Sequence, residues 1–215
     1  MRKWIPVLLI VMAMIASVIV YPQLPEQMPT HWNMRGEVDG SSSRLFGAWM
    51  VPLMMAVIWL IMRALPHIDP RRANDEKFAT MYEALIIVTL AFMLGLHFVL
   101  LAMAMGTNMD MNRIVIASVG AFFGVIGFLL PKAHPNWFVG IRTPWTLTSD
   151  AAWERTHRMG GPLFMLIGAL TVVASLAAPK MAVWVLTVST VAVTVFLFVY
   201  SYRVWKEDGH RRSAI

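Results

Sequence analysis

The sequence contains no cysteine, and only 14% of its residues are charged. Without cysteine the chain can form no disulfide, thiol nucleophile or cysteine-ligated metal site. Soluble domains carry about 25% charged residues and are usually less than half apolar, whereas 58% of this chain is hydrophobic. The composition therefore predicts a lipid bilayer as the surroundings. A length of 215 residues leaves no room for a separate soluble domain beside the membrane helices.

Ionisable groups are scarce inside the hydrophobic runs, where only His97 lies well within one. An ionisable residue inside a membrane is a functional hypothesis by default, although a neutral histidine can also simply bond a backbone carbonyl. Proton- and sodium-coupled transporters usually embed aspartate, glutamate or several such groups, so their absence counts against an ion-driven pump. The 18 methionines are spread along the chain rather than clustered with histidine, which favours apolar filling over a copper site.

Six hydrophobic runs are long enough to cross a bilayer, which takes about 20 mostly apolar residues. They occupy residues 4–20, 45–65, 84–105, 114–130, 162–178 and 181–204. We therefore predict an all-α integral membrane protein with six transmembrane helices. The first run also has the basic start of a signal peptide. It is longer than the usual apolar core of about 7–15 residues, and no clear A-x-A cleavage site follows, so we expect it to stay as an anchor.

The distribution of lysine and arginine predicts the orientation, because cytoplasmic loops carry the excess of these residues. Fourteen of the 18 lie at the two termini and in the second and fourth connections, and four lie on the opposite side. We therefore expect both termini in the cytoplasm, the connection at 22–44 outside the cell and the connection at 132–159 inside. The inner set is Arg2, Lys3, Arg63, Arg71, Arg72, Lys77, Lys132, Arg142, Arg155, Arg158, Arg203, Lys206, Arg211 and Arg212, and the outer set is Arg35, Arg44, Arg113 and Lys180.

Two of the runs carry residues that favour close helix packing. In the fourth run, glycines recur at helical spacing and include a G-x-x-x-G pair, which lets another backbone come close. In the sixth run, threonines recur on one face, which we expect to turn inward and bond a neighbouring helix; a polar substrate path is the alternative. The packing residues are Gly120, Gly124 and Gly127 in the fourth run, and Thr187, Thr190 and Thr194 in the sixth.

The outer connection is stiffened by three prolines, which restrict the backbone to extended conformations. Turn signals stand at Arg35-Gly36 and Asp39-Gly40. A metal site would need His31 with a nearby carboxylate and a third strong ligand, and no third ligand is evident in the sequence. The candidate residues for sensing an external ligand are Pro29, His31, Trp32, Asn33, Gly36, Asp39 and Gly40.

The inner connection combines aromatic, basic and cap-forming residues. Ser149 is a typical N-cap residue and Asp150 suits the positive end of a helix, so we expect a short helix over residues 150–159 at the inner membrane interface. That helix would place Trp153 and His157 on one face. An anchor on anionic lipid and a docking surface for a cytoplasmic protein both remain open. A lone His157 without a neighbouring nucleophile and acid does not favour catalysis.

Motifs in both connections resemble a known family. The inner motif runs from N136 through G-I-R-T-P-W-T to a later tryptophan and histidine, and it resembles the signature of SdpI-type immunity proteins. The outer motif, with its L-P and P-T-H-W-N segments, resembles the uncharacterised N-terminal domain that often precedes that signature. The inner motif residues, which are also the candidates for binding a partner, are Asn136, Gly140, Arg142, Thr143, Pro144, Trp145, Thr146, Trp153 and His157.

The two motifs occur in the order expected for the family, and the resemblance covers nearly the whole chain. It implies three units. Residues 1–65 form a two-helix unit with the outer loop at 22–44, residues 66–131 hold helices three and four, and residues 132–215 hold the inner loop at 132–159 with helices five and six.

The resemblance also implies an immunity and signalling role. The best-known member of the family protects a Bacillus cell from a toxin that the cell itself secretes, and holds a DNA-binding repressor at the membrane. Here the outer loop would sense a toxin and the inner loop would hold a repressor. We therefore expect a multi-pass membrane protein with the bilayer, a toxin and a repressor as partners, and with no direct binding of nucleic acid.

We expect no enzymatic activity, cofactor or metal, because an active site would need groups from both loops and these are predicted on opposite faces of the membrane. A small-solute or peptide transporter is the alternative function. It would use the threonine face of the sixth run together with His97.

Overall fold

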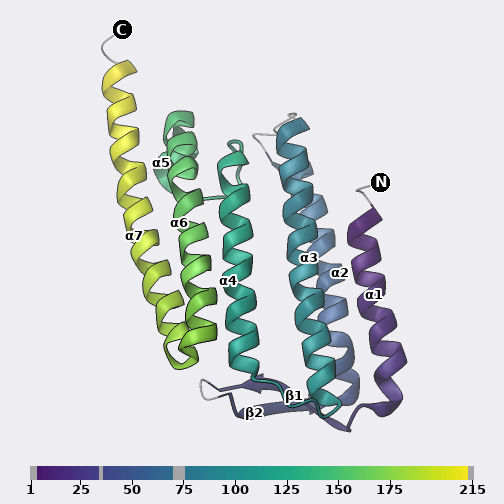
Figure 1. Ribbon diagram of the computed structural model, residues 1–215. Helices are drawn as coiled ribbons and strands as arrows, with labels where there is room; N and C mark the ends of the chain where they lie inside the picture. Colours follow the sequence, from purple (N-terminus) through teal and green to yellow (C-terminus); the bar gives the residue numbers. More distant parts are fainter. Residues whose placement is uncertain (1–3, 34–35, 70–75, 213–215) are drawn as a thin grey trace.

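The computed structural model describes residues 4–33, 36–69 and 76–212. Six helices in these ranges are long and apolar enough to cross a membrane, which confirms the predicted number and makes the chain a multi-pass membrane protein (Figure 1). They are α1 (Ile5–Val20), α2 (Arg44–Ile68), α3 (Glu76–Ala104), α4 (Met111–Leu129), α6 (Asp150–Ala177) and α7 (Pro179–Arg212). Part of the charge-based orientation prediction falls outside the described residues, namely Arg2, Lys3, Arg35, Arg71, Arg72 and the side chains of Lys77, Arg211 and Arg212.

Capping side chains begin three of the membrane helices. The Ser43 side chain accepts a hydrogen bond from the amide of Phe46 at the start of α2, and Asp110 caps α4 in the same way. Ser149 caps α6, which confirms the predicted N-cap. Each cap satisfies an amide that has no partner inside its own helix, so the helix starts are set by local chemistry as well as by the apolar runs.

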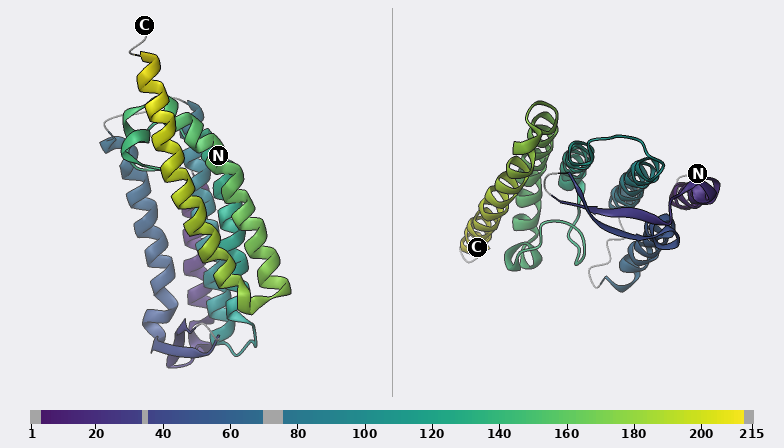
Figure 2. Two further views of the ribbon diagram at one scale, coloured as in Figure 1. Left: turned by 90° about the vertical axis from the view of Figure 1, so that its left-hand side faces the viewer. Right: turned by 90° about the horizontal axis from the view of Figure 1, so that it is seen from below.

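The helices stand side by side in two groups of three (Figures 1 and 2). One group contains α1, α2 and α3, which contact one another, and in the other group α6 packs on both α4 and α7. The groups meet along α3 and α4, and a common buried cluster near one end joins them, with Tyr82 of α3, Leu129 of α4 and Trp153 of α6 among its members. Both chain ends lie at that end of the bundle (Figure 1).

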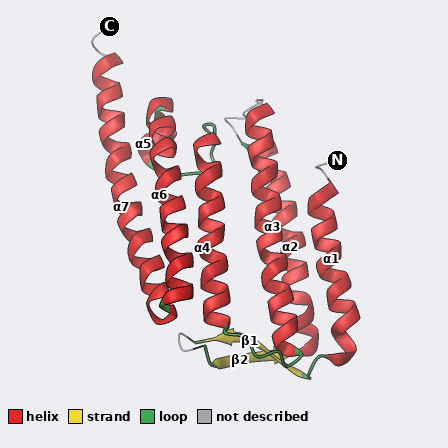
Figure 3. Cartoon of the chain, in the orientation of Figure 1, coloured by secondary structure: helices red, strands yellow, loops and turns green. Residues whose placement is uncertain are grey.

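The predicted all-α fold misses a short antiparallel sheet at the opposite end, where β1 (Gln27–Trp32) pairs with β2 (Val38–Ser43) (Figure 3). The chain turns where the first signal predicted, because the Gly36 amide donates to the carbonyl of Asn33 and Gly36 has a φ of 79°. The second turn prediction, at Asp39-Gly40, is wrong. Both residues lie inside β2, where Gly40 faces His31 so closely that a Cβ at this position would lie 2.9 Å from the His31 Cβ.

The inner connection also differs from the prediction. Residues 150–159 are helical, but they are the first turns of the continuous helix α6 rather than a separate short helix. Pro162 lies inside α6 without ending it, because neighbouring helices can satisfy the backbone groups that a proline frees in a membrane helix. Two short elements precede α6, namely η3 (Leu130–Lys132) and α5 (Pro144–Thr148).

Candidate functional site

His157 is the centre of the inner loop. Its Nδ1–H donates to the carbonyl of Trp153 at 2.8 Å, and its Nε2 accepts from the amide of Ile141 at 2.9 Å. The ring is 1% exposed and stacks on the Trp153 indole, with 4.1 Å between the ring centroids. Because Nε2 accepts a hydrogen bond from a backbone amide, the imidazole is neutral, and both of its nitrogens are used to hold the loop on α6.

Gly140 allows this contact. Its φ is 119°, a conformation that residues with a side chain rarely adopt. A Cβ at Gly140 would also overlap Nε2 of His157. The glycine therefore serves both the backbone conformation and the close approach of the imidazole to the neighbouring Ile141 amide.

Asn136 and Trp153 fasten the first half of the loop. The Asn136 amide group donates to the carbonyls of His134 and Val139, and its oxygen accepts from the amide of Val139 at 2.6 Å. The indole of Trp153 donates to the carbonyl of Ala133 at 2.7 Å. Asn136 and Trp153 are each 1% exposed. Their side chains therefore provide the hydrogen-bond partners that buried backbone groups can no longer obtain from water.

Two threonines fasten the second half through the short helix α5. The Thr146 hydroxyl accepts from the Thr143 amide at 2.9 Å and donates to the carbonyl of Ile141 at 2.9 Å, and the Thr143 hydroxyl in turn caps α5. The Thr143 hydroxyl also lies 3.0 Å from the hydroxyl of Ser201. This buried contact joins the loop to α7.

Most of the predicted partner-binding residues therefore cannot touch a partner directly. Asn136, Thr143, Thr146, Trp153 and His157 are all buried, and their hydrogen bonds go to the chain itself. The side chains that remain accessible are Arg142 and Pro144, which are exposed, and the half-buried Trp145. The polar and aromatic composition of the loop is evident from the sequence. It is not evident from the sequence that most of these side chains point inward and hold the loop together.

The surroundings of the accessible residues are partly fixed. The Arg142 guanidinium donates a hydrogen bond to the carbonyl of Trp137. The Trp145 ring of α5 packs against α7. It contacts the rings of Phe198 and Tyr202 at centroid distances of 4.7 and 5.2 Å.

Several contacts of the loop came from residues that the sequence did not single out. The amide of Trp137 donates to the carboxylate of Asp69 at the end of α2, which ties the loop to the first group of helices. Ser149 donates to Asp208 of α7 at 2.8 Å, in addition to capping α6. No sequence signal identifies these two pairs, because the partners in each pair are dozens of positions apart in the chain.

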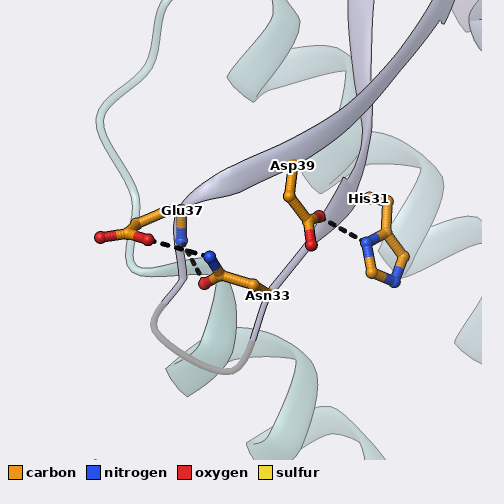
Figure 4. A network of polar contacts seen from close by, with 4 residues as sticks. All are labelled: His31, Asn33, Glu37 and Asp39. Atoms are coloured by element: carbon orange, nitrogen blue, oxygen red, sulfur yellow. Dashed lines mark hydrogen bonds and ion pairs between the residues drawn. The ribbon is translucent and has the colours of Figure 1, made fainter.

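At the other end of the bundle, the hairpin carries a chain of polar contacts (Figure 4). His31 donates from Nδ1 to the carboxylate of Asp39 at 2.5 Å, and the Asn33 side chain bonds both the carboxylate and the amide of Glu37. His31 and Asp39 are exposed. Among the described residues, no three histidine or acidic side chains come together in a way that could hold a metal ion.

The inner face of the hairpin packs on the ends of the first helix group. Met28 is fully buried in a cluster that includes Leu24, Ala48 and Leu101, and Trp32 packs against it. Gly47 of α2 makes room, because a Cβ there would lie 2.8 Å from the Met28 sulfur. Pro29, Asn33 and Gly36 are half-buried. One side of the hairpin is thus fixed to the membrane helices, and the other side is open.

The inner loop and the helices beside it match a described protein family, the SdpI/YfhL protein family, over residues 132–202. Residues 8–56 match a domain of unknown function (DUF1648). Over 211 residues the chain is 23% identical to the immunity protein SdpI of Bacillus subtilis strain 168, an alignment that covers 98% of this chain and 99% of that protein.

A second relative is the uncharacterized membrane protein YbgB of the same organism, which is 38% identical over 48 residues, covering 22% of this chain and 53% of that protein. No solved structure matches the chain. The SdpI/YfhL segment begins at Lys132 in η3 and ends at Tyr202, one of the two α7 rings that Trp145 contacts. It therefore contains nearly the whole buried network of the inner loop, and that network is a property of the SdpI/YfhL part of the chain.

Away from the loops, His97 lies fully buried among the first three helices. The Ser17 hydroxyl of α1 donates to the carbonyl of Ala48 in α2, at 2.7 Å, and lies 2.9 Å from Nε2 of His97 in α3. Because the single hydroxyl proton is used on Ala48, His97 must donate from Nε2. Its Nδ1 has no hydrogen-bond partner within the described ranges. The histidine thus links three helices from a buried position.

The predicted glycine face of α4 lies against α6. A Cβ at Gly120 would lie 3.0 Å from the carbonyl oxygen of Gly168, and one at Gly127 would lie 2.6 Å from that of Gly161. A Cβ added at Gly124 would find open space, whereas a Cβ added at Gly168 would lie 2.6 Å from the backbone nitrogen of Gly124. The partner glycines of α6, Gly161 and Gly168, were not predicted from the sequence, and they let the two backbones approach closely.

The predicted threonine face of α7 does not turn inward as a whole. Thr187 and Thr194 are exposed, and only Thr190 is half-buried. The reason is the position of α7, which packs on α6 at the edge of the bundle and is surrounded by other helices on one side only (Figure 2). The face that the transporter alternative requires therefore does not line the interior of the chain.

Proposed function

We propose that the protein is a membrane immunity protein that protects its cell from a secreted antimicrobial polypeptide. The observation that carries this proposal is the end-to-end match to the immunity protein SdpI, which includes both connections and all six helices. The proposal contains no catalytic step, because both nitrogens of the buried His157 are bonded to backbone groups and cannot exchange a proton with a substrate.

We propose further that both termini and the inner loop face the cytoplasm, with the hairpin outside. The excess of lysine and arginine supports this orientation, and both chain ends lie at the end of the bundle opposite the hairpin (Figure 1). Because the chain has no cysteine, single cysteines report sidedness cleanly. A membrane-impermeant maleimide should label Val38→Cys in intact cells and Thr148→Cys only after permeabilisation. The reverse labelling pattern would disprove the orientation.

On the inner side, the buried network provides a rigid platform that presents Arg142, Pro144 and Trp145. We propose that this platform recruits a cytoplasmic regulator, a DNA-binding repressor, when toxin is bound outside. Rigidity supports such a role, because a preordered surface loses less conformational entropy when a partner binds.

A growth assay tests the immunity proposal. A sensitive bacterial host would carry the wild-type gene, the Arg142→Ala/Trp145→Ala variant or an empty vector, and would be challenged with the secreted toxin encoded nearest to this gene. We expect the wild type and the variant to protect alike, because the substituted side chains lie at the end of the molecule opposite the hairpin, while only the wild type retains the regulator at the membrane. Arg158→Ala, which removes another exposed inner arginine, should behave as the wild type. Failure of the wild type to protect would refute the immunity function.

A further inference from the structure

The open edge of the hairpin is the outer side of β2. Pro29 of β1 is paired with Ser41 of β2. Proline has no N–H, so this pair cannot be one of the hydrogen-bonded pairs of the ladder. Such pairs alternate with non-bonded ones along an antiparallel ladder. It follows that Ser42 points its backbone groups toward β1, and that Ser41 and Ser43 point theirs away from it.

Nothing in the described part of the chain covers this edge. No hydrogen bond joins the outward amide or carbonyl of Ser41 to another described residue, and Ser41, Ser43 and Asp39 are exposed. Both strands contact α2, but only β1 also contacts α3 and buries a large side chain, Met28, against the helix ends. The sheet therefore has one accessible edge, and it lies at the end of the bundle opposite the chain ends (Figure 1).

Protein edges of this kind are normally protected by lysine, proline or a short strand length. β2 contains neither lysine nor proline, and the run from Gly40 to Ser43 carries only small side chains. Its charged residue is Asp39, and Glu37 immediately precedes the strand. An edge with small side chains and with acidic groups at one end suits an extended segment that carries a basic residue at the matching end, since opposite charges across strands attract.

We propose that this edge is where the secreted polypeptide binds, by adding an extended, basic segment to β2 as a third strand. Main-chain hydrogen bonds to the outward amide and carbonyl of Ser41 and to the amide of Ser43 provide the attachment, because the Ser43 carbonyl is used by the first turn of α2. The charges of Asp39 and Glu37 set the direction of the added strand. This inference rests on the proposed immunity function and specifies the surface and the binding mode through which it works.

Ser41→Pro tests strand addition in the same growth assay, with the toxin encoded nearest to the gene as the probe. The substitution removes the outward N–H and places a ring on the edge, while every ladder bond to β1 is kept. We expect protection to fall about tenfold or more. Ser41→Ala, which changes only the side chain, should protect as the wild type. Equal protection by Ser41→Pro and wild type would overturn the inference and leave the immunity function standing, whereas failure of the wild type itself would remove both.

Cysteine cross-linking provides a measurement that does not depend on the stability of the proline variant. Ser41→Cys in the otherwise cysteine-free full-length protein, reconstituted in lipid nanodiscs, would be mixed with single-cysteine variants of the same toxin and oxidised. A third strand predicts disulfides at every second toxin position, because side chains alternate along a strand. Cross-links spaced three or four positions apart would indicate a bound helix and overturn the inference.

Discussion

Replacing Gly140 by alanine should lower the free energy of unfolding by about 3 kcal/mol, which combines about 1–2 kcal/mol of left-handed backbone strain with the cost of inserting an atom into a packed site, about 1–3 kcal/mol. The φ of Gly140 is 119°, and an added Cβ would overlap Nε2 of His157. The imidazole would have to move, and the hydrogen bond from the Ile141 amide would be lost with it. Reversible unfolding in mixed micelles, followed by tryptophan fluorescence, measures the change.

Gly106→Ala is the matched control for this substitution. Gly106 has a φ of 90°, but an added Cβ there would meet nothing within 4 Å among the described residues. Gly106→Ala should therefore lower the free energy of unfolding only by the cost of backbone strain, about 1–2 kcal/mol. If the two variants lose the same free energy, the contact with His157 contributes nothing, and the imidazole is not the structural centre of the inner loop.

Gly127→Ala should separate α4 from α6 and destabilise the protein by about 2–3 kcal/mol. The new methyl group would lie 2.6 Å from the carbonyl oxygen of Gly161 and 2.6 Å from the amide nitrogen of Met165. These are backbone atoms of a packed helix, which cannot rotate aside as the end of a flexible side chain can. The same micelle titration measures the loss.

Gly124→Ala, three residues before Gly127 on the same helix, should not destabilise the protein. An added Cβ at Gly124 finds open space, and alanine is favoured over glycine inside a helix by about 1 kcal/mol. The variant should therefore be as stable as the wild type or slightly more stable. Equal destabilisation by both substitutions would show that helix propensity or lipid contact, rather than the α4–α6 approach, determines the effect.

The membrane helices could be predicted because a run of about 20 apolar residues has few alternatives to a helix in lipid. The hairpin could not, because its strands lack a regular apolar alternation and Pro29 is unfavourable in most strands. Its stability comes from contacts that are distant in sequence, such as Met28 on Gly47 of α2. A one-dimensional pattern does not contain that information.

The inner loop shows a different limit. The sequence singled out the residues of this loop as partner-binding, whereas the structure buries most of them against their own backbone. A histidine or asparagine in a loop has the same appearance whether it contacts another protein or its own backbone. What distinguishes the two is burial, and burial of His157 and Asn136 depends on how the chain folds back onto α6.

The last helix, α7, has 34 residues. At 1.5 Å per residue it is about 50 Å long, whereas the hydrocarbon core measures about 30 Å. Its C-terminal turns reach beyond the other helices (Figure 1), and there Asp208 is bonded to Ser149 and Glu207 to Arg155, both at the start of α6. The C-terminal part of α7 is therefore mechanically coupled to the start of α6. A load applied to it would be transmitted first to the helix turns that carry Trp153 and His157, and through these two side chains to the inner loop.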